Sequence, residues 1–304
     1  MNSGASSFVE GVDLSFYIIL GISAFFLVGI TFAMIFFVIK YRRSKNPKAS
    51  NIKGSNTLEI VWTVIPTILV LIMFYYGWLG FKPMREKPDN AMTIKAHAQM
   101  WSWSFEYEDG RRNQELVVPI NKPIILELIS HDVLHSLYIP AFRIKEDMIP
   151  GKKDNWMWFK AQEEGEYDIL CAEYCGERHS YMLSKVRVLP EDEYKTWYRE
   201  KLGKSDDPTG LQILKQNACI SCHSMDGSEI VGPTFKGIWG RKEMVTTDGK
   251  KREITVDRDY IIKSIYQPNA DVVEGFNSGQ MISYESTISE EQIDQIIEYL
   301  KTLE

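Results

Sequence analysis

The sequence of 304 residues predicts three units in order along the chain: a pair of membrane-spanning helices, an all-β sandwich and a small all-α domain. Three observations support this fold class: two long uncharged apolar runs, then alternating apolar and polar residues, and finally an apolar stripe with helical spacing at the C-terminus. The predicted units are an N-terminal segment at 1–13, spans at 14–39 and 60–81 with a loop at 40–59, a sandwich at 82–189, a linker at 190–207 and the all-α domain at 208–304.

The apolar runs 14–39 and 60–81 are the segments expected to cross a membrane. Each reaches the length of about 20 apolar residues that a helix needs to cross the hydrocarbon core. A helix buried inside a soluble domain is the alternative, and the lack of charge in both runs argues against it. Aromatic residues near the run ends are typical of a membrane interface; they are Tyr41, Trp62, Tyr75, Tyr76 and Trp78.

Charged residues around the two runs predict their orientation. The loop at 40–59 is basic before Glu59, whereas the N-terminal flank carries only Glu10 and Asp13. By the positive-inside rule the loop is cytoplasmic, so both termini and the soluble domains lie on the outer side. Because no basic region precedes the first run, we expect a retained anchor rather than a cleavable signal peptide.

Alternation with a period of two follows the second span and predicts half-buried strands. Trp101, Trp103, Phe105 and Tyr107 alternate with polar residues, and further short apolar runs follow, separated by prolines and glycines. Several short strands at this spacing are typical of a β-sandwich. The loops at one end of such a sandwich can hold functional residues on a rigid scaffold.

A cluster of soft metal ligands lies near the end of the predicted sandwich. Cys171, Cys175, His179 and Met182 fall within twelve residues, and His135 lies upstream. Thiolate, imidazole and a weak thioether form the ligand set of electron-transfer copper. A disulfide or a structural zinc site is the alternative, but neither explains the placement of Met182 and His135.

A second cysteine motif begins the all-α domain. Cys219-Ile-Ser-Cys222-His223 is the attachment signature of a c-type haem, in which the histidine is an axial ligand. A disulfide is the alternative, and the adjacent His223 favours haem. Farther on, Ser289 and Gln292 are spaced to cap a helix. Its apolar face comprises Ile293, Ile296, Ile297 and Leu300.

Residues 205–304 carry 10 Lys and Arg and 17 Asp and Glu, a net charge of 10 − 17 = −7. The whole chain has a formal net charge of −6, so the acidic character is concentrated in the predicted haem domain. The two cysteine motifs together use all four cysteines of the chain. A chain with both motifs is predicted to carry electrons.

The spans, the predicted sandwich, His135 and the run from Cys171 to Met182 resemble subunit II of the haem-copper cytochrome c oxidases over residues 14–189. The C-terminal part resembles a fused cytochrome c. The resemblance implies a cupredoxin-like sandwich and a dinuclear copper centre (CuA). In that centre the thiolates of Cys171 and Cys175 bridge two coppers, His135 and His179 each bind one, and Met182 and the Glu173 carbonyl complete the set.

The same resemblance implies roles for three further residues. The Glu173 side chain would bind magnesium shared with subunit I, with a solvated loop acid as the alternative. Glu59, in Thr57-Leu-Glu59-Ile-Val-Trp62, would lie at the mouth of a proton-uptake path, with an interfacial acid as the alternative. Trp101 would be the exposed tryptophan that accepts electrons from cytochrome c.

Four other positions, one of which departs from the family pattern, are given no ligand or electron-entry role. The family usually has tyrosine between the two tryptophans, where this chain has Ser102. Trp103 is expected in the core. His97 and His131 match no ligand position and are interpreted as structural or surface residues.

In the haem domain, the segment 232–241 resembles the loop that packs against haem in small cytochromes c. The resemblance implies Met281, shortly before the last helix, as the second axial ligand. Met244 is the alternative, whereas Met225 lies too close to His223 to reach the opposite face of a haem.

The predicted function is the subunit through which electrons enter a respiratory oxidase of the bacterial cytoplasmic (inner) membrane. Electrons would pass from a donor to haem c, to the copper pair and to subunit I, which reduces oxygen and translocates protons. The expected partners are subunits I and III and an upstream cytochrome c or quinol-oxidising complex; no nucleic acid is expected. The alternative is an electron-transfer subunit of a related nitric oxide reductase or a stand-alone carrier.

Overall fold

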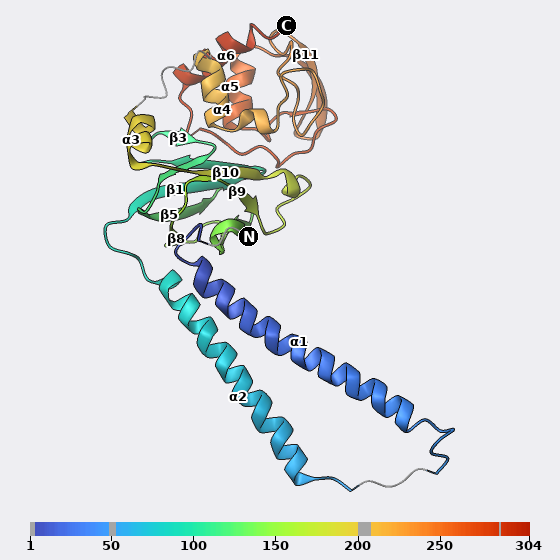
Figure 1. Cartoon of the computed structure of the whole chain (residues 1–304). Helices are drawn as coiled ribbons and strands as arrows, with labels where there is room; N and C mark the ends of the chain where they lie inside the picture. Colours follow the sequence, from blue (N-terminus) through green and yellow to red (C-terminus); the bar gives the residue numbers. More distant parts are fainter. Residues whose placement is uncertain (1–3, 49–52, 200–207, 286) are drawn as a thin grey trace.

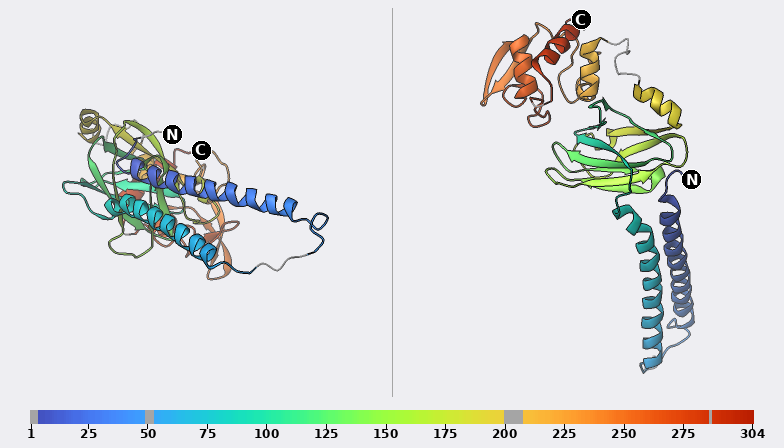
Figure 2. Two further views of the ribbon diagram at one scale, coloured as in Figure 1. Left: turned by 60° about the horizontal axis from the view of Figure 1, so that its bottom comes forward. Right: turned by 90° about the vertical axis from the view of Figure 1, so that its left-hand side faces the viewer.

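The computed structural model describes residues 4–48, 53–199, 208–285 and 287–304, and they form three stacked parts (Figure 1). Two long helices extend from one end, a β-sandwich lies in the middle, and a mainly helical domain caps the far end. The side view in Figure 2 separates the three parts clearly.

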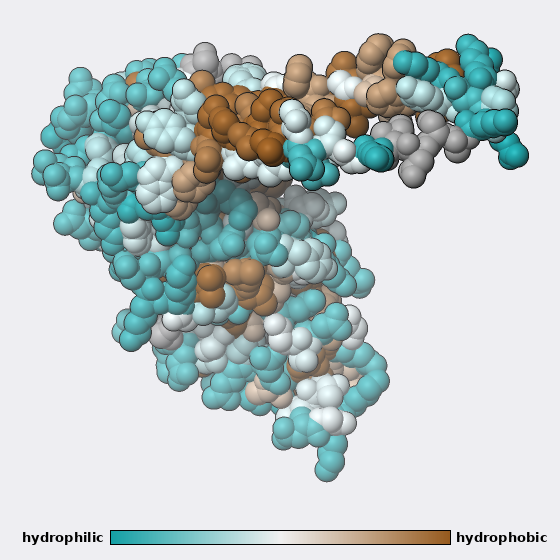
Figure 3. Space-filling view, turned by 90° about the horizontal axis from the view of Figure 1, so that it is seen from below, coloured by the Kyte–Doolittle hydropathy of each residue, from teal (hydrophilic) through white to brown (hydrophobic). Residues whose placement is uncertain are grey.

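The long helices are α1 (Val9–Lys40) and α2 (Asn56–Phe81), and a 3-10 turn, Lys82–Arg85, continues α2. Both are long and apolar enough to cross a membrane, and Figure 3 shows their apolar surface ending in hydrophilic residues at the loop. They begin before the predicted starts at 14 and 60, because the helical backbone continues beyond each apolar run, to Val9 in α1 and to a polar N-terminal end in α2. At α2 that end is Ser55, whose side chain accepts a hydrogen bond from the Leu58 amide.

Close contact between the helices is seen at the end beside the sandwich. A Cβ at Gly80 would lie 3.2 Å from the Gly11 carbonyl oxygen, so glycine permits this approach. Nearby, the Ser15 hydroxyl donates to the Tyr76 carbonyl at 3.1 Å. The helices separate towards their loop (Figure 1), so the helix pair is anchored at the sandwich.

The sandwich consists of two five-stranded sheets, with orders β3-β2-β1-β5-β8 and β4-β10-β9-β6-β7. Trp103, Phe105, Leu126, Leu137 and Ile169 are among the buried residues between them. The strands of the first sheet are β1 (Met92–Gln99), β2 (Ser102–Glu106), β3 (Arg112–Asn113), β5 (Pro123–Ser130) and β8 (Trp156–Lys160). Those of the second are β4 (Leu116–Pro119), β6 (His135–Ile139), β7 (Ile144–Met148), β9 (Gly165–Cys171) and β10 (Leu183–Leu189).

The predicted linker at 190–207 begins with a helix, α3 (Glu191–Arg199). Tyr194 is buried, and the Trp197 ring packs edge-on against Tyr107 at 5.2 Å. The Arg111 guanidinium donates to the Trp197 carbonyl at 3.0 Å. The start of the predicted linker is therefore part of the sandwich domain, because aromatic residues one helical turn apart give this charged segment an apolar face; residues 200–207 lie outside the described part.

The C-terminal domain contains the helices α4 (Thr209–Gln216), α5 (Arg258–Tyr266) and α6 (Glu290–Leu300). A small sheet of β12 (Lys250–Thr255), β11 (Lys242–Thr247) and β13 (Val272–Val273) accompanies them, although only helices are predicted there from the sequence. The capping box of Ser289 and Gln292 is present, and the predicted apolar face of α6 is buried. Helices α4 and α6 cross at Gly210, where a Cβ would clash with the Gln295 carbonyl oxygen.

Candidate metal centre and haem site

The predicted copper ligands converge at one end of the sandwich. His135 begins β6, Cys171 ends β9, and the loop between β9 and β10 brings back Cys175, His179 and Met182. The sulfur atoms of Cys171 and Cys175 are 3.8 Å apart. The other ligand-atom separations are 3.9 Å from Cys171 Sγ to His135 Nδ1, 3.5 Å from Cys175 Sγ to His179 Nδ1, and 3.9 Å from Cys175 Sγ to Met182 Sδ.

These distances match a metal site better than a disulfide. A disulfide bond would bring the two sulfurs to about 2.05 Å, and both cysteines are free. The ligand atoms of His135, Cys171 and Cys175 all lie within 4.8 Å of one another, close enough to share an ion. The Glu173 carbonyl oxygen accepts a hydrogen bond from the Cys171 thiol at 3.2 Å, so this backbone atom also faces the cluster.

Asp132 orients the first histidine of the cluster. Its carboxylate accepts from His135 Nε2 at 2.8 Å and from the Met100 amide at 2.6 Å. Burial opposes ionisation of Asp132, but the hydrogen bonds from His135 and the backbone amides outweigh it and lower the pKa of this carboxyl group. A carboxylate that fixes the proton on Nε2 leaves Nδ1 available for a metal.

The electrostatics of the two thiols also suit a cation. Burial opposes ionisation of Cys171, but hydrogen bonds with His135 and the backbone lower its pKa to about 6. Burial and the adjacent Cys171 thiolate raise the pKa of Cys175 to about 12. The protein alone therefore stabilises one negative charge in the pair, and a bound cation would stabilise the second.

The second cysteine motif follows α4 at the edge of an apolar cavity. The His223 side chain donates from Nδ1 to the Pro233 carbonyl at 2.7 Å and stacks on Phe235 at 4.6 Å. A Cβ on Gly232 would lie 2.5 Å from the imidazole, so glycine is needed to admit the ring. Because Nδ1 is used, Nε2 is the nitrogen left to bind a haem iron.

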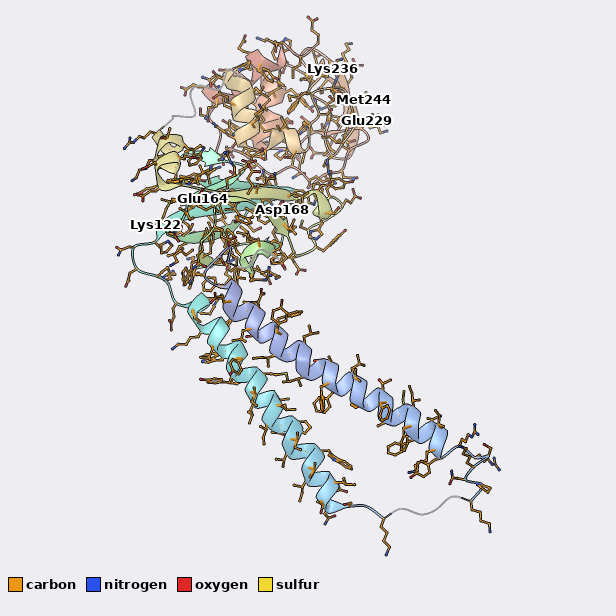
Figure 4. All side chains as sticks on the ribbon, viewed as in Figure 1. Lys122, Glu164, Asp168, Glu229, Lys236 and Met244 are labelled. Atoms are coloured by element: carbon orange, nitrogen blue, oxygen red, sulfur yellow. The ribbon has the colours of Figure 1, made fainter. Side chains whose placement is uncertain are left out.

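The cavity provides an apolar environment beside His223. Among its lining residues are Leu214, Ile261, Ile296 and Met281. Met244, by contrast, is 38% exposed on β11 and lies at the outer side of the domain (Figure 4). The residues present thus fit a haem with His223 on one face, and their positions favour Met281 over Met244 as the second ligand.

Family comparisons cover all three parts of the chain. Residues 1–77 match the transmembrane domain of cytochrome c oxidase subunit II, residues 110–189 match its periplasmic domain, and residues 209–304 match cytochrome c. The chain belongs to the cytochrome c oxidase subunit II family.

Curated relatives agree with this assignment. Cytochrome c oxidase subunit 2 of Alkalihalophilus pseudofirmus is 32% identical over 306 residues, covering 94% of this chain and 85% of the relative. That of Bacillus sp. (strain PS3) is 31% identical over 290 residues, covering 87% and 78%. The solved periplasmic domain of subunit II (CoxB) of Bradyrhizobium japonicum is 34% identical over 37% of this chain and 94% of its own, with a TM-score of 0.35.

Trp101 differs from the exposed tryptophan that the subunit II resemblance implied. Its side chain is buried, with the residue only 7% exposed. The indole Nε1 donates to the Cys175 carbonyl at 3.0 Å. The ring rests on Gly176, where a Cβ would lie 3.0 Å from it. The prediction of exposure is wrong because the ring packs on the Cys175–Gly176 loop of the sandwich, a long-range contact that local sequence does not reveal. The haem domain contacts the preceding residue, Met100, through Cys222.

The remaining candidate residues are Trp103, His97, His131, Glu59 and Glu173. Trp103 is in the core, 2% exposed. His97 and His131 stack on each other and share a hydrogen bond of 2.9 Å, apart from the copper cluster. Glu59 is exposed in the first turn of α2, at the loop end of the helix, and the Glu173 side chain is half-buried.

Sequence reasoning missed several supporting residues. Asp132 carried a signal, since a carboxylate three residues before a candidate histidine ligand is well placed to orient it. Gly176 and Gly232 carried none that a single sequence reveals, because their role depends on how the rings of Trp101 and His223 pack in the folded chain.

Proposed function

We propose that this chain is the subunit through which electrons enter a cytochrome c oxidase, with a dinuclear copper centre in the sandwich and a haem c in the C-terminal domain. Each group, when bound, accepts and releases single electrons. The observation that carries the proposal is the short route between their sites. Cys222 Sγ lies 3.9 Å from the Met100 carbonyl oxygen, and the next residue, Trp101, donates to the Cys175 carbonyl.

The two coppers would be held by both thiolates as bridges, with His135 on one ion and His179 on the other. Met182 and the Glu173 carbonyl would be the weak ligands. His135 and Met182 are fully buried, and Asp132 restrains the first imidazole. Ligands fixed in this way move little when the charge of the site changes, which favours rapid electron transfer.

In the C-terminal domain, Cys219 and Cys222 would hold the haem covalently, and His223 and Met281 would be its axial ligands. Burial lowers the pKa of His223, which keeps the imidazole neutral and able to bind iron. The apolar walls of the cavity would exclude water from a bound haem.

Membrane placement and partners complete the proposal. The basic loop after α1 favours a cytoplasmic loop and an outer location for both soluble domains. The apolar, exposed faces of α1 and α2 would contact lipid and subunits I and III. Glu173 would take part in a magnesium site at the subunit I contact, and Glu59 would lie at the entrance of a proton path. A cytochrome c or a quinol-oxidising complex would be the upstream donor.

Purification of the chain in its native membrane complex tests this function. We expect two copper ions and one covalent haem per chain, and oxygen consumption when a reduced cytochrome is supplied. A complex that consumes nitric oxide but not oxygen, or a chain that purifies without partner subunits, would contradict the assignment to an oxidase.

A further inference from the structure

The copper domain supplies part of the wall of the haem cavity. Gln99 ends β1 and Met100 follows it in the turn to β2, yet both are among the residues that line this cavity. From the other side, Cys222 packs against the core of the sandwich, with its sulfur 3.9 Å from the Met100 carbonyl oxygen. The wall of the haem site is therefore built by both domains.

Tyr284 connects the two domains within this wall. It is buried, with the residue only 9% exposed, and it lines the same cavity. The Gln99 side chain donates to the Tyr284 hydroxyl at 2.8 Å, and this hydroxyl donates to the Asn217 carbonyl at 3.2 Å. Asn217 lies two residues before Cys219, the first haem cysteine. One hydroxyl group thus joins the copper domain to the segment that would hold the haem.

Tyr284 also belongs to the loop that carries Met281. The backbone of this loop is attached to the end of α5, because the Tyr284 amide donates to the Ile265 carbonyl at 3.1 Å. The Ser283 hydroxyl donates to the Tyr266 carbonyl at 2.6 Å. Met281 itself is partly buried against the core of the haem domain. The hydroxyl bonds of Tyr284 add a second attachment for this loop, on the side of the copper domain.

We propose that the haem site is shared by the two domains, and that Gln99 of the copper domain is a positioning residue for the loop of the second axial ligand. Gln99 holds Tyr284 against the cavity wall, and this contact keeps the loop in the position from which Met281 would bind the iron. This inference rests on the proposed function and adds a residue outside the C-terminal domain that influences the reduction potential of the haem.

The potential of the haem should be higher with this contact than without it. The iron gains positive charge when it is oxidised, so an apolar site that is closed to water disfavours the oxidised form. A methionine ligand also raises the potential. Loss of the bond from Gln99 would admit water at the wall and loosen the loop of Met281, and both changes should lower the potential.

Redox titration of the complete, metal-loaded complex, followed at the haem absorbance, tests the proposal in Gln99→Met. Methionine has about the length of glutamine but no donor for Tyr284. We expect the potential to fall by the equivalent of about threefold or more in the equilibrium, which is about 28 mV at 59 mV per tenfold. Thr93→Ala, at an exposed position on the same strand, is the matched control and should leave the potential unchanged.

A second variant, Tyr284→Phe, shows whether Gln99 acts through the hydroxyl group. It removes the same bond from the side of the haem domain, so it should lower the potential in the same direction. Adding Gln99→Met to Tyr284→Phe should then produce little further change, because the two substitutions break one interaction. If Tyr284→Phe does not fold, the comparison of Gln99→Met with Thr93→Ala decides alone.

An unchanged potential in Gln99→Met, or shifts that simply add in the double variant, would overturn the proposal. Covalent haem and copper absorption are measured on every sample, and oxygen consumption on the wild-type complex. The expected shift in a complex that does not consume oxygen would refute the assignment to an oxidase and leave the shared haem site standing. A chain without covalent haem would refute the proposed function and this inference together.

Discussion

The copper domain and the haem domain prepare their sites in opposite ways. In the sandwich, two sheets pack directly on each other, and His135 and Met182 are buried as part of that core. In the C-terminal domain the helices and loops surround a cavity lined by His223 and Met281. The first site is a product of the folded chain, whereas the second encloses a space that the haem would fill as part of the core.

The shape of the copper site and the stability of the haem domain should therefore depend differently on their bound groups. A site assembled by a complete core should keep its shape without its ion, so losing copper should cost function more than fold. A domain whose interior is a ligand cavity gains much of its folding free energy from the ligand. Substitutions at the two sites should therefore have different consequences for fold and function.

The largest effect is expected when both haem cysteines are replaced. Cys219→Ser with Cys222→Ser should prevent covalent attachment, and residues 209–304 should lose their resistance to protease because the cavity remains unfilled. The copper absorption should be retained. Met244→Leu, on the surface of the same domain, serves as the control. Equal protease resistance with and without attached haem would show that the domain has a sufficient core of its own.

Replacing a copper ligand should have the reverse outcome. Cys175→Ser removes a bridging thiolate, so the mixed-valence copper signal should be abolished in electron paramagnetic resonance. Haem c should remain attached and the haem domain should remain folded. An unchanged copper signal in this variant would refute the site assignment.

Asp132→Asn should weaken the copper site without removing a ligand. The amide cannot accept at both positions used by His135 and Met100, so copper affinity should fall about 10–100-fold. Competition with a copper chelator measures the affinity, and Asp168→Asn, which changes an exposed carboxylate on β9, is the control. Wild-type affinity would mean that the sandwich holds His135 without this carboxylate.

A smaller effect is expected where α4 crosses α6. Gly210→Ala places a methyl group against the Gln295 carbonyl, so the free energy of unfolding of the haem domain should fall by about 1–3 kcal/mol. The exposed neighbour Thr209→Ala should change it little. Thermal unfolding followed at the haem absorption compares the two variants, and equal midpoints would show that the crossing can adjust.

Local motifs predicted much of this molecule. The ligands Cys171 to Met182 lie in one short loop, and the haem cysteines and His223 are contiguous, so the sequence alone brings them together. The apolar spacing of α6 and its capping box gave the last helix for the same reason. These features depend on neighbours within a few residues.

Long-range contacts account for the differences. Trp101 was expected at the surface, but its ring is buried on the loop of Cys175 and Gly176, and its indole nitrogen bonds to a residue 74 positions away in sequence. The sequence of α3 predicts a linker, because its many charged residues obscure the helical spacing of the aromatic residues that pack on Tyr107. The three-stranded sheet of the haem domain joins β13 to a hairpin across α5, a pairing that no local pattern indicates.

The central claim is that electrons reach the copper centre through the docked haem domain, and stopped-flow reduction across a salt series tests it most directly. The fully oxidised complex is mixed with a reduced basic cytochrome c, and haem and copper absorbances are followed together. Because residues 205–304 carry a net charge of −7, salt should slow haem reduction. Copper reduction should follow it at a rate that salt barely changes. Reduction of copper before haem, or equal salt sensitivity of both steps, would contradict the account.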